Sequence, residues 1–369
     1  MTEVTDIVAG AGIWGCTLAR RLAESGRRVL VLERRSGIGG NVRCETDPGT
    51  GIEIHTYGSH IFHTHDVAVW DFVRRFTDFN GYQHKVLASY RGKIYHLPMG
   101  LALVNKFFGV ELQPKEVSAF MADESHSSAI FDAFFRGYTS KQWGRAPEEI
   151  DPGIIKRVPV RDNYDTNYFN DCWQGIPSEG YNRLFDRLLD HPDIALECGA
   201  DVSLETIRGW TGKGVRVFYS GPIDNLFGYR HGALPWRSLR FESETLPLRD
   251  FQGTSVVNYT EAEVPYTRIH EFKHYHPEGR LTGGWGFTAD RTVIMREYPR
   301  TWKLGDEPYY PVANDASAEL FARYRGEVDA FNAALPSDGA RLVVGGRLGA
   351  YRYFDMDQAM AAALAVDIG

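Results

Sequence analysis

The chain has 369 residues, of which 43% are hydrophobic and 24% are charged, and its net charge is −7. This is the composition of an ordinary soluble protein of two or three domains, and the negative charge argues against a general nucleic-acid binder, which needs an excess of cations. No apolar run reaches the roughly 18 residues of a membrane helix, no leader precedes the first predicted strand, and the four cysteines lack metal-ligand spacing, so we expect a cytoplasmic protein.

Residues 6–15, DIVAGAGIWG, predict a dinucleotide-binding turn. An apolar strand leads into Gly10, Gly12 and Gly15, spaced as GxGxxG, and a helix is predicted over 13–23. The first glycine permits a tight turn, the second lets the backbone approach a pyrophosphate, and the third lets helix and strand pack closely. The N-terminus of the helix then offers free N–H groups to the phosphates.

The next segment indicates which dinucleotide is bound. A second strand over 29–32 ends at Glu33, whose carboxylate is placed to bind a pair of ribose hydroxyls. Gly39, Gly40 and Asn41 follow, which suggests a loop that returns to the pyrophosphate of a long, extended cofactor. This pattern favours FAD over NAD, and the alternative is an irregular surface loop.

Four histidines crowd residues 52–65, a predicted strand and loop: His55, His60, His63 and His65. No cysteine or acidic pair accompanies them at ligand spacing, so we expect no metal centre here. The interpretation that we favour places one or two imidazoles beside the cofactor as hydrogen-bond donors or proton carriers.

The middle of the chain predicts an insertion of helices. Residues 66–79 have the spacing of an amphipathic helix, and residues 82–97 alternate as a β-hairpin. Three helical segments then follow with little strand signal between them. They cover residues 101–108, 114–122 and 127–139.

A loop over residues 150–161 combines prolines and a glycine with Lys156, Arg157 and Arg161. Such a loop is suited to move and to bind an anion, although a solvated surface loop is the alternative. Residues 163–173 add aromatic side chains on which a sugar or a base can stack.

The remainder returns to the first domain. A helix over 180–190 and a strand over 215–219 come before a run of antiparallel strands between 237 and 295. Residues 341–368 predict a strand, a glycine turn and a helix, which present a second helix N-terminus to the cofactor.

Eight motifs, taken together and in order, resemble those of the bacterial UDP-galactopyranose mutases. They are GSHIFHTH at 58–65, RGYTSKQWG at 136–144, RVPVRDNYDTNYF at 157–169, YSGPID at 219–224, PWRSLRFE at 235–242, PYTRIHEFKH at 265–274, GDEPYYPV at 305–312 and GRLGAYRYFDMD at 346–357.

The resemblance implies an α/β fold of three parts with the substrate in the cleft between them. A FAD-binding Rossmann-type domain is expected over 1–80, 178–228 and 338–369, and a small helical bundle over 98–157. An antiparallel β-sheet domain is expected over 81–97, 158–177 and 229–337.

The activity that the resemblance implies is a ring contraction that interconverts UDP-galactopyranose and UDP-galactofuranose without net redox change. It requires reduced FAD, whose nitrogen 5 forms a covalent bond to the sugar as UDP leaves. The implied partner is a UDP-sugar, with neither nucleic acid nor membrane, and the implied assembly is a homodimer.

The resemblance also assigns residues. Two arginines, Arg157 and Arg268, bind the diphosphate, with His63 and His60 beside the flavin. The remaining substrate residues are Phe134, Phe135, Tyr138, Trp143, Arg161, Tyr168, Arg237, Tyr310 and Tyr353. The cofactor residues are Gly10, Gly12, Gly15, Glu33, Arg34, Gly40, Asn41, Arg347, Asp355 and Met356.

The segment after the hairpin departs from the family pattern. Gly100, Val104 and Lys106 replace helix-borne polar groups, and Trp236 stands where tyrosine is usual. These changes permit a different nucleotide sugar, such as UDP-arabinopyranose or a deoxy sugar. Other classes that we weigh are a flavin oxidoreductase of the amine-oxidase type and a flavoprotein that binds nucleotide sugars without chemistry.

Overall fold

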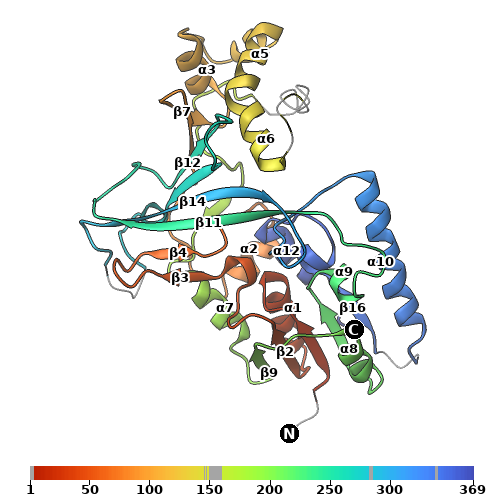
Figure 1. Cartoon of the computed structure of the whole chain (residues 1–369). Coiled ribbons are helices and arrows are strands. Elements are labelled where there is room, and N and C mark those ends of the chain that lie inside the picture. Colours follow the sequence, from red (N-terminus) through yellow and green to blue (C-terminus); the bar gives the residue numbers. More distant parts are fainter. Residues whose placement is uncertain (1–3, 145, 147, 149–159, 282–285, 337–339) are drawn as a thin grey trace.

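The computed structural model describes residues 4–144, 146, 148, 160–281, 286–336 and 340–369. Figure 1 shows a domain built on a parallel sheet at the bottom, a second sheet across the middle and a group of helices at the top. The predicted α/β class is confirmed. Among the described helices, none combines the length and the apolarity needed to cross a bilayer.

The lower domain contains a five-stranded parallel sheet. Its strands lie in the order β16 (Leu342–Val344), β10 (Arg216–Tyr219), β1 (Asp6–Ala9), β2 (Val29–Glu33) and β9 (Ile194–Cys198). Successive side chains of a strand point to opposite faces, so the neighbours Ile7 and Val8 belong to two different hydrophobic cores. Both faces are therefore covered by helices, as an all-parallel sheet requires.

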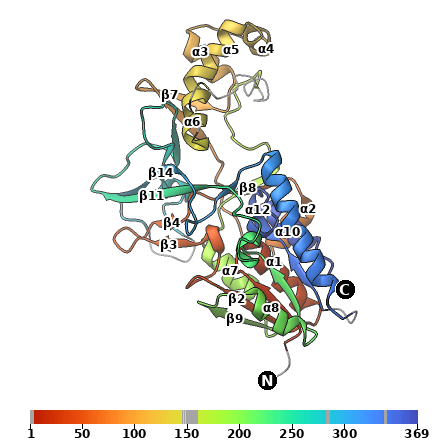
Figure 2. The same ribbon diagram turned by 45° about the vertical axis from the view of Figure 1, so that its right-hand side comes forward.

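Each face has its own set of helices. The core of Val8 includes residues of α1 (Ile13–Glu24), α7 (Tyr181–Leu189) and α12 (Met356–Leu364). The core of Ile7 includes residues of α8 (Leu204–Thr211), α9 (Ile223–Leu226) and α10 (Asp315–Ala333). Figure 2 shows α10 running alongside this domain.

The second sheet has seven strands. Their order is β15 (Tyr310–Pro311), β11 (Trp236–Leu246), β14 (Thr292–Thr301), β13 (Arg268–Glu271), β12 (Val256–Tyr259), β6 (Val86–Tyr90) and β7 (Lys93–Leu97). Neighbouring strands are antiparallel, as predicted, except that β12 pairs with β6 in parallel. The hairpin of β6 and β7 thereby becomes the continuation of the sheet.

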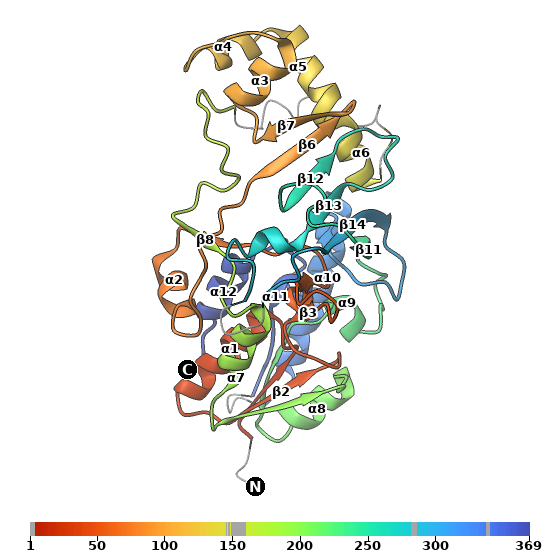
Figure 3. The ribbon, with the colours of Figure 1, turned by 90° about the vertical axis from the view of Figure 1, so that its left-hand side faces the viewer.

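The helical group follows that hairpin, and Figure 3 shows it at the end of β6 and β7. It consists of α3 (Leu101–Phe108), α4 (Val117–Met121), α5 (Glu124–Ile130), a π-helical turn (Phe131–Arg136) and α6 (Gly137–Trp143). The smaller elements are two strand pairs, β3 (Cys44–Thr46) with β4 (Glu53–His55) and β5 (Phe62–Thr64) with β8 (Trp173–Gly175), the helices α2 (Val67–Val73) and α11 (Gly346–Gly349), and 3₁₀ turns at Gly40–Val42 and Phe272–Tyr275.

The structure departs from the sequence predictions in three places. The helix predicted over 66–79 ends at Val73, and the one predicted over 127–139 is divided by the π-helical turn. The 19-residue helix α10 falls within the range 229–337 expected for the sheet domain, but it packs on the parallel sheet. Its fully buried side chains are few, so its sequence lacks the continuous apolar stripe that predicts a helix.

Candidate active site

The first cleft opens at the carboxyl ends of β1, β2 and β10. Gly10 has a φ of +108°, and a Cβ built on it would lie 2.1 Å from Ser220 Oγ. A Cβ on Gly15 would lie 1.9 Å from the carbonyl oxygen of Gly10. Only glycine fits at both positions. Because the turn carries no side chain there and no described side chain caps α1, the N–H groups at the N-terminus of α1 are open to a ligand in the cleft.

The loop after β2 returns to this turn, as the sequence predicts. The Gly39 N–H donates to the carbonyl of Ala11 at 2.8 Å, and a Cβ on Gly40 would lie 3.0 Å from Gly12 Cα. The buried carboxylate of Glu33 accepts the N–H of Ala11 at 2.8 Å, which fixes it beside the same turn. All ten residues predicted to bind the cofactor line this one cleft. A backbone cradle at a helix N-terminus, closed by a fixed carboxylate, fits the pyrophosphate and ribose of a dinucleotide.

A second cleft lies between the parallel-sheet domain, the second sheet and α6. Eight of the predicted catalytic and substrate residues line it: His60, His63, Tyr138, Trp143, Tyr168, Arg268, Tyr310 and Tyr353. Four residues line both clefts: His60, Arg347, Asp355 and Met356. A ligand in the second cleft would therefore meet one end of a cofactor held in the first.

Arg268 places a permanent cation in the second cleft. Its Nη2 donates to Tyr138 Oη at 2.6 Å, and its Nε lies 3.4 Å from Glu297 Oε1. Burial alone would lower the pKa of this arginine, but the Glu297 carboxylate outweighs burial, and the pKa of Arg268 lies well above its ordinary value. The guanidinium is thus charged at every pH at which the protein is folded, and it is suited to bind a diphosphate.

Two tyrosines complete the polar wall of this cleft. The rings of Tyr310 and Tyr353 have their centroids 5.8 Å apart, and the guanidinium carbon of Arg347 lies 5.0 Å from the centroid of Tyr353. Burial, followed by the charge of Asp355, raises the pKa of Tyr353 to about 12, and burial also raises the pKa of Tyr310. Both phenols therefore keep their protons and act as hydrogen-bond donors.

The two predicted histidines differ in their surroundings. His63 lies at β5, where its Nδ1 is 2.7 Å from Asp171 Oδ2 and its ring stacks on Phe169 at 3.7 Å between centroids. His60 is half-buried by its neighbours, and this burial together with the charge of Arg347 lowers its pKa to about 4. His60 is therefore neutral near pH 7.

Several predicted substrate residues lie away from the cleft lining. Phe134 is buried in the core of the helical group, and Phe135 packs against that core. Arg161 donates to backbone carbonyls of its own loop, and Arg237 donates to the carbonyl of Gln142 at 2.9 Å at the end of α6. Both guanidinium groups are therefore hydrogen-bonded within the protein and do not face the cleft as free cations. Arg157 and most of the 150–161 loop fall outside the described residues.

Several polar residues of this region were not predicted, and three of them line the second cleft or support a residue that does. His84 and Asn258 line the second cleft, and Asp171 supports His63 from behind. The buried Oδ1 of Asn258 has no hydrogen-bond partner among the described residues. The alternation of buried residues over 82–86 is visible in the sequence as part of the predicted hairpin, but no motif marked the three residues as neighbours.

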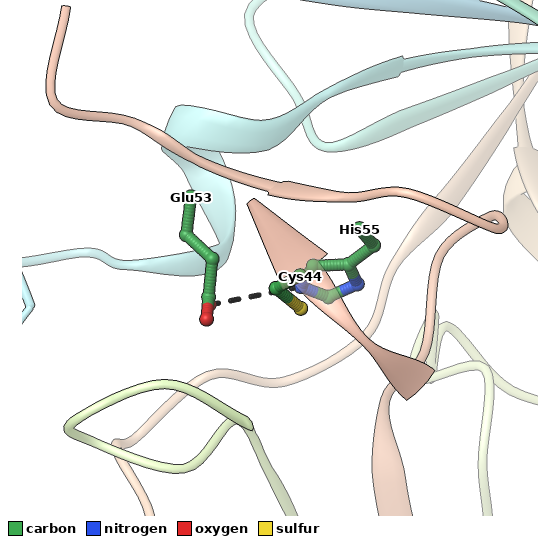
Figure 4. A group of neighbouring side chains, drawn as sticks. All are labelled: Cys44, Glu53 and His55. Atoms are coloured by element: carbon green, nitrogen blue, oxygen red, sulfur yellow. Dashed lines mark ion pairs between the residues drawn. The ribbon is translucent and has the colours of Figure 1, made fainter. Parts of the chain in front are cut away.

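Figure 4 shows a further group of side chains behind His60 whose atoms are of the type that binds metals: Cys44, Glu53 and His55. His55 Nε2 lies 3.9 Å from Glu53 Oε2, and the dashed line in the figure marks this contact. However, His55 Nδ1 accepts the N–H of His60 at 3.0 Å, so the neutral ring carries its proton on Nε2 and has no lone pair there for a cation. We interpret this group as support for the backbone of His60.

The fold and the two clefts define a dinucleotide-binding α/β protein whose cofactor end opens onto a cationic binding site. Comparison with known proteins identifies the family within this class. Residues 133–353 match the family model of UDP-galactopyranose mutase, and residues 8–76 match that of the NAD(P)-binding Rossmann-like domain. The chain belongs to the UDP-galactopyranose mutase family and is an isomerase.

Relatives match over nearly the whole chain. A probable UDP-galactopyranose mutase of Klebsiella pneumoniae is 37% identical over 99% of this chain and 94% of its own. A dTDP-fucopyranose mutase of Escherichia coli is 35% identical over 97% of this chain and 96% of its own. The crystal structure of reduced UDP-galactopyranose mutase shares the fold with a TM-score of 0.67, at 15% identity over 98% of this chain and 94% of that one.

Proposed function

We propose that this protein is a FAD-dependent mutase that interconverts UDP-galactopyranose and UDP-galactofuranose without net redox change. The observation that carries the proposal is the junction of the two clefts at His60, Arg347, Asp355 and Met356. It brings the end of a dinucleotide next to a site lined by Arg268. A nucleophile carried by the cofactor and a departing diphosphate need this proximity.

In this proposal, different residues of the second cleft bind different parts of the nucleotide sugar. Arg268 holds the diphosphate and stabilises the charge that develops as it leaves, with the protonated phenols of Tyr310 and Tyr353 as further donors. Tyr138 and Trp143 of α6 contact the uridine. Arg157 is proposed as the second guanidinium of this clamp.

Reduced FAD, when bound, supplies an electron-rich nitrogen that acts as the nucleophile toward the anomeric carbon. The Nδ1–H of His63 points to Asp171, so its Nε2 carries a lone pair that can accept a proton from a sugar hydroxyl. His60 remains a neutral neighbour of the junction and adds no charge to it.

A second candidate is the same chemistry on another nucleotide sugar. The dTDP-fucopyranose mutase of Escherichia coli is nearly as similar as the Klebsiella relative, at 35% against 37% identity. Of the residues that depart from the family pattern, Val104 is buried in the core of the helical group, and neither it nor Gly100 lines the second cleft, so this candidate depends on the similarity to the Escherichia coli relative. A dTDP-linked deoxy sugar is therefore the substrate to test beside UDP-galactose, together with UDP-arabinopyranose.

The test is turnover with a limiting reductant. Purified holoenzyme is reduced with dithionite and mixed with UDP-galactofuranose, dTDP-fucofuranose or UDP-arabinofuranose, and the products are separated by chromatography. We expect many turnovers for each equivalent of dithionite, because a mutase returns its cofactor unchanged. Conversion that stops when the reductant is consumed would indicate an oxidoreductase and would falsify the proposal.

A further inference from the structure

His84 lines the second cleft without belonging to any motif. The chain is extended before β6, so alternate side chains face inward: Tyr82, His84 and Val86 are buried. His84 is only 6% exposed, yet it borders the cleft together with His63 and Arg268. A buried imidazole at the wall of a binding cleft is a candidate for contact with the ligand.

The environment of the ring fixes its orientation. Phe169 stacks on it with centroids 5.4 Å apart and planes at 24°, and Tyr168 meets it edge-on at the same centroid distance. Behind it, Tyr82 Oη lies 2.8 Å from His84 Nδ1 and 2.6 Å from Ser255 Oγ. The ring is therefore held by two aromatic neighbours and at Nδ1.

The same contacts determine which nitrogen carries the proton. A phenol is a stronger donor than a serine hydroxyl, and an unprotonated imidazole nitrogen is a stronger acceptor than a hydroxyl. Ser255 therefore donates to Tyr82, and Tyr82 donates to His84 Nδ1. The proton of the neutral ring is then on Nε2, which has no hydrogen-bond partner among the described residues and is therefore available to a ligand in the cleft.

His63, which also stacks on Phe169, shows the reverse arrangement. Its Nδ1–H donates to the Asp171 carboxylate at 2.7 Å, which leaves a lone pair on Nε2. The ring of Phe169 stacks on both imidazoles, with centroids 3.7 Å from His63 and 5.4 Å from His84. The cleft thus contains one hydrogen-bond acceptor, His63 Nε2, and one donor, His84 Nε2–H. Asp171 and Tyr82 determine these roles by their hydrogen bonds to the Nδ1 atoms of the two rings.

We propose that His84 is a specificity-determining residue that donates a hydrogen bond from Nε2 to one hydroxyl of the substrate's sugar. This inference rests on the proposed function. Because burial and the charge of Arg268 keep the ring neutral, His84 suits a hydroxyl better than a phosphate, and Arg268 already serves the diphosphate. The neighbours His63 and Phe169 lie on the sugar's side of that clamp.

The test separates binding of the sugar from binding of the nucleotide. His84→Phe keeps a ring of similar shape against Phe169 and removes the donor, whereas His84→Gln retains an N–H. Binding of UDP and of UDP-galactose to oxidised holoenzyme is titrated calorimetrically for the wild type and both variants. We expect His84→Phe to weaken UDP-galactose by roughly ten- to fifty-fold and UDP by less than about two-fold, and His84→Gln to restore most of the loss.

A series of monodeoxy UDP-galactose analogues identifies the hydroxyl. One of these analogues lacks the hydroxyl that accepts the hydrogen bond from Nε2. The wild type and His84→Phe should bind that analogue with equal affinity, because neither protein can form the hydrogen bond with it. Equal weakening of UDP and UDP-galactose, or a loss that persists with every analogue, would overturn the inference. Absence of turnover by the wild type would contradict the proposed function and not the role of His84. The binding measurements do not depend on turnover, so they test the role of His84 separately.

Discussion

At the scale of the residue, the chemistry of the cleft depends on groups that do not line it. Asp171 lies behind His63, and its second oxygen is 3.0 Å from Nδ1 of the exposed His65. Burial raises the pKa of this carboxyl, but the hydrogen bonds from His65 and His63 outweigh burial and lower it. Asp171 is therefore charged near pH 7 and holds the proton of His63 on Nδ1. It is a positioning residue.

Asp171→Asn tests this role. An amide can turn either its oxygen or its NH₂ to Nδ1, so the preference for one tautomer of His63 is lost while the shape is kept. We expect kcat to fall by at least about ten-fold with little change in KM. The ¹⁵N shifts of the His63 ring, which report the protonated nitrogen, should move at the same time.

His65→Gln is the matched control, because it removes the other partner of Asp171 and leaves His63 in place. Its kcat should stay close to that of the wild type. If Asp171→Asn turns over normally with an altered ¹⁵N spectrum, the tautomer of His63 has no part in the reaction.

At the scale of the element, α6 carries Tyr138 and Trp143 to the cleft and is anchored by Lys141. The ammonium lies 2.7–3.0 Å from the backbone carbonyls of Tyr259, Glu261, Val264 and Tyr266 and shares its three N–H donors among them. These carbonyls belong to the last residue of β12 and to the connection that leads from it to β13. One side chain thereby joins the helical group to the second sheet.

Lys141→Met should weaken the attachment of α6 to the second sheet. The methionine fills the space of the lysine stem but leaves the carbonyls without their donor, which costs about 2–3 kcal/mol. We expect a lower melting temperature and a KM for the nucleotide sugar raised several-fold, because α6 no longer holds Tyr138 in place. Lys115→Met, on the exposed surface of the same helical group, should change neither value.

The elements also show what could be predicted from sequence. The turn at Gly10–Gly15 and the loop to Asn41 were predicted correctly because local backbone requirements select glycine there. Arg268 and Tyr310 came from motifs, and the structure brings both to the cleft. In contrast, Arg237 donates to carbonyls of α6, and His84 and Asp171 act across contacts between distant segments. Such partners are created by the tertiary fold, so no local pattern contains them.

At the scale of the whole molecule, the fold buries several neutral histidines. Burial is the main cause of the lowered pKa values of His55, His60, His84 and His270, with values of about 4 for His60 and about 3 for His84. In the unfolded chain these groups regain the ordinary value of about 6.5. Between pH 6.5 and 4 the unfolded state therefore binds more protons than the folded state.

The free energy of unfolding must then decrease as the pH falls through this window, by up to about 1.4 kcal/mol per pH unit for each such histidine. Urea unfolding of the holoenzyme at saturating FAD, from pH 7 to pH 5, should show this slope, and His84→Gln should lower it by one proton. His65→Gln should leave the slope near pH 5 unchanged, because hydrogen bonding to Asp171 raises the pKa of His65 and the ring is therefore protonated there in both the folded and the unfolded state; the stability that this pair adds is lost as the pH rises through the raised pKa. A His84→Gln slope equal to that of the wild type would mean that His84 takes up its proton in the folded protein, and the neutral donor assigned to it would be excluded.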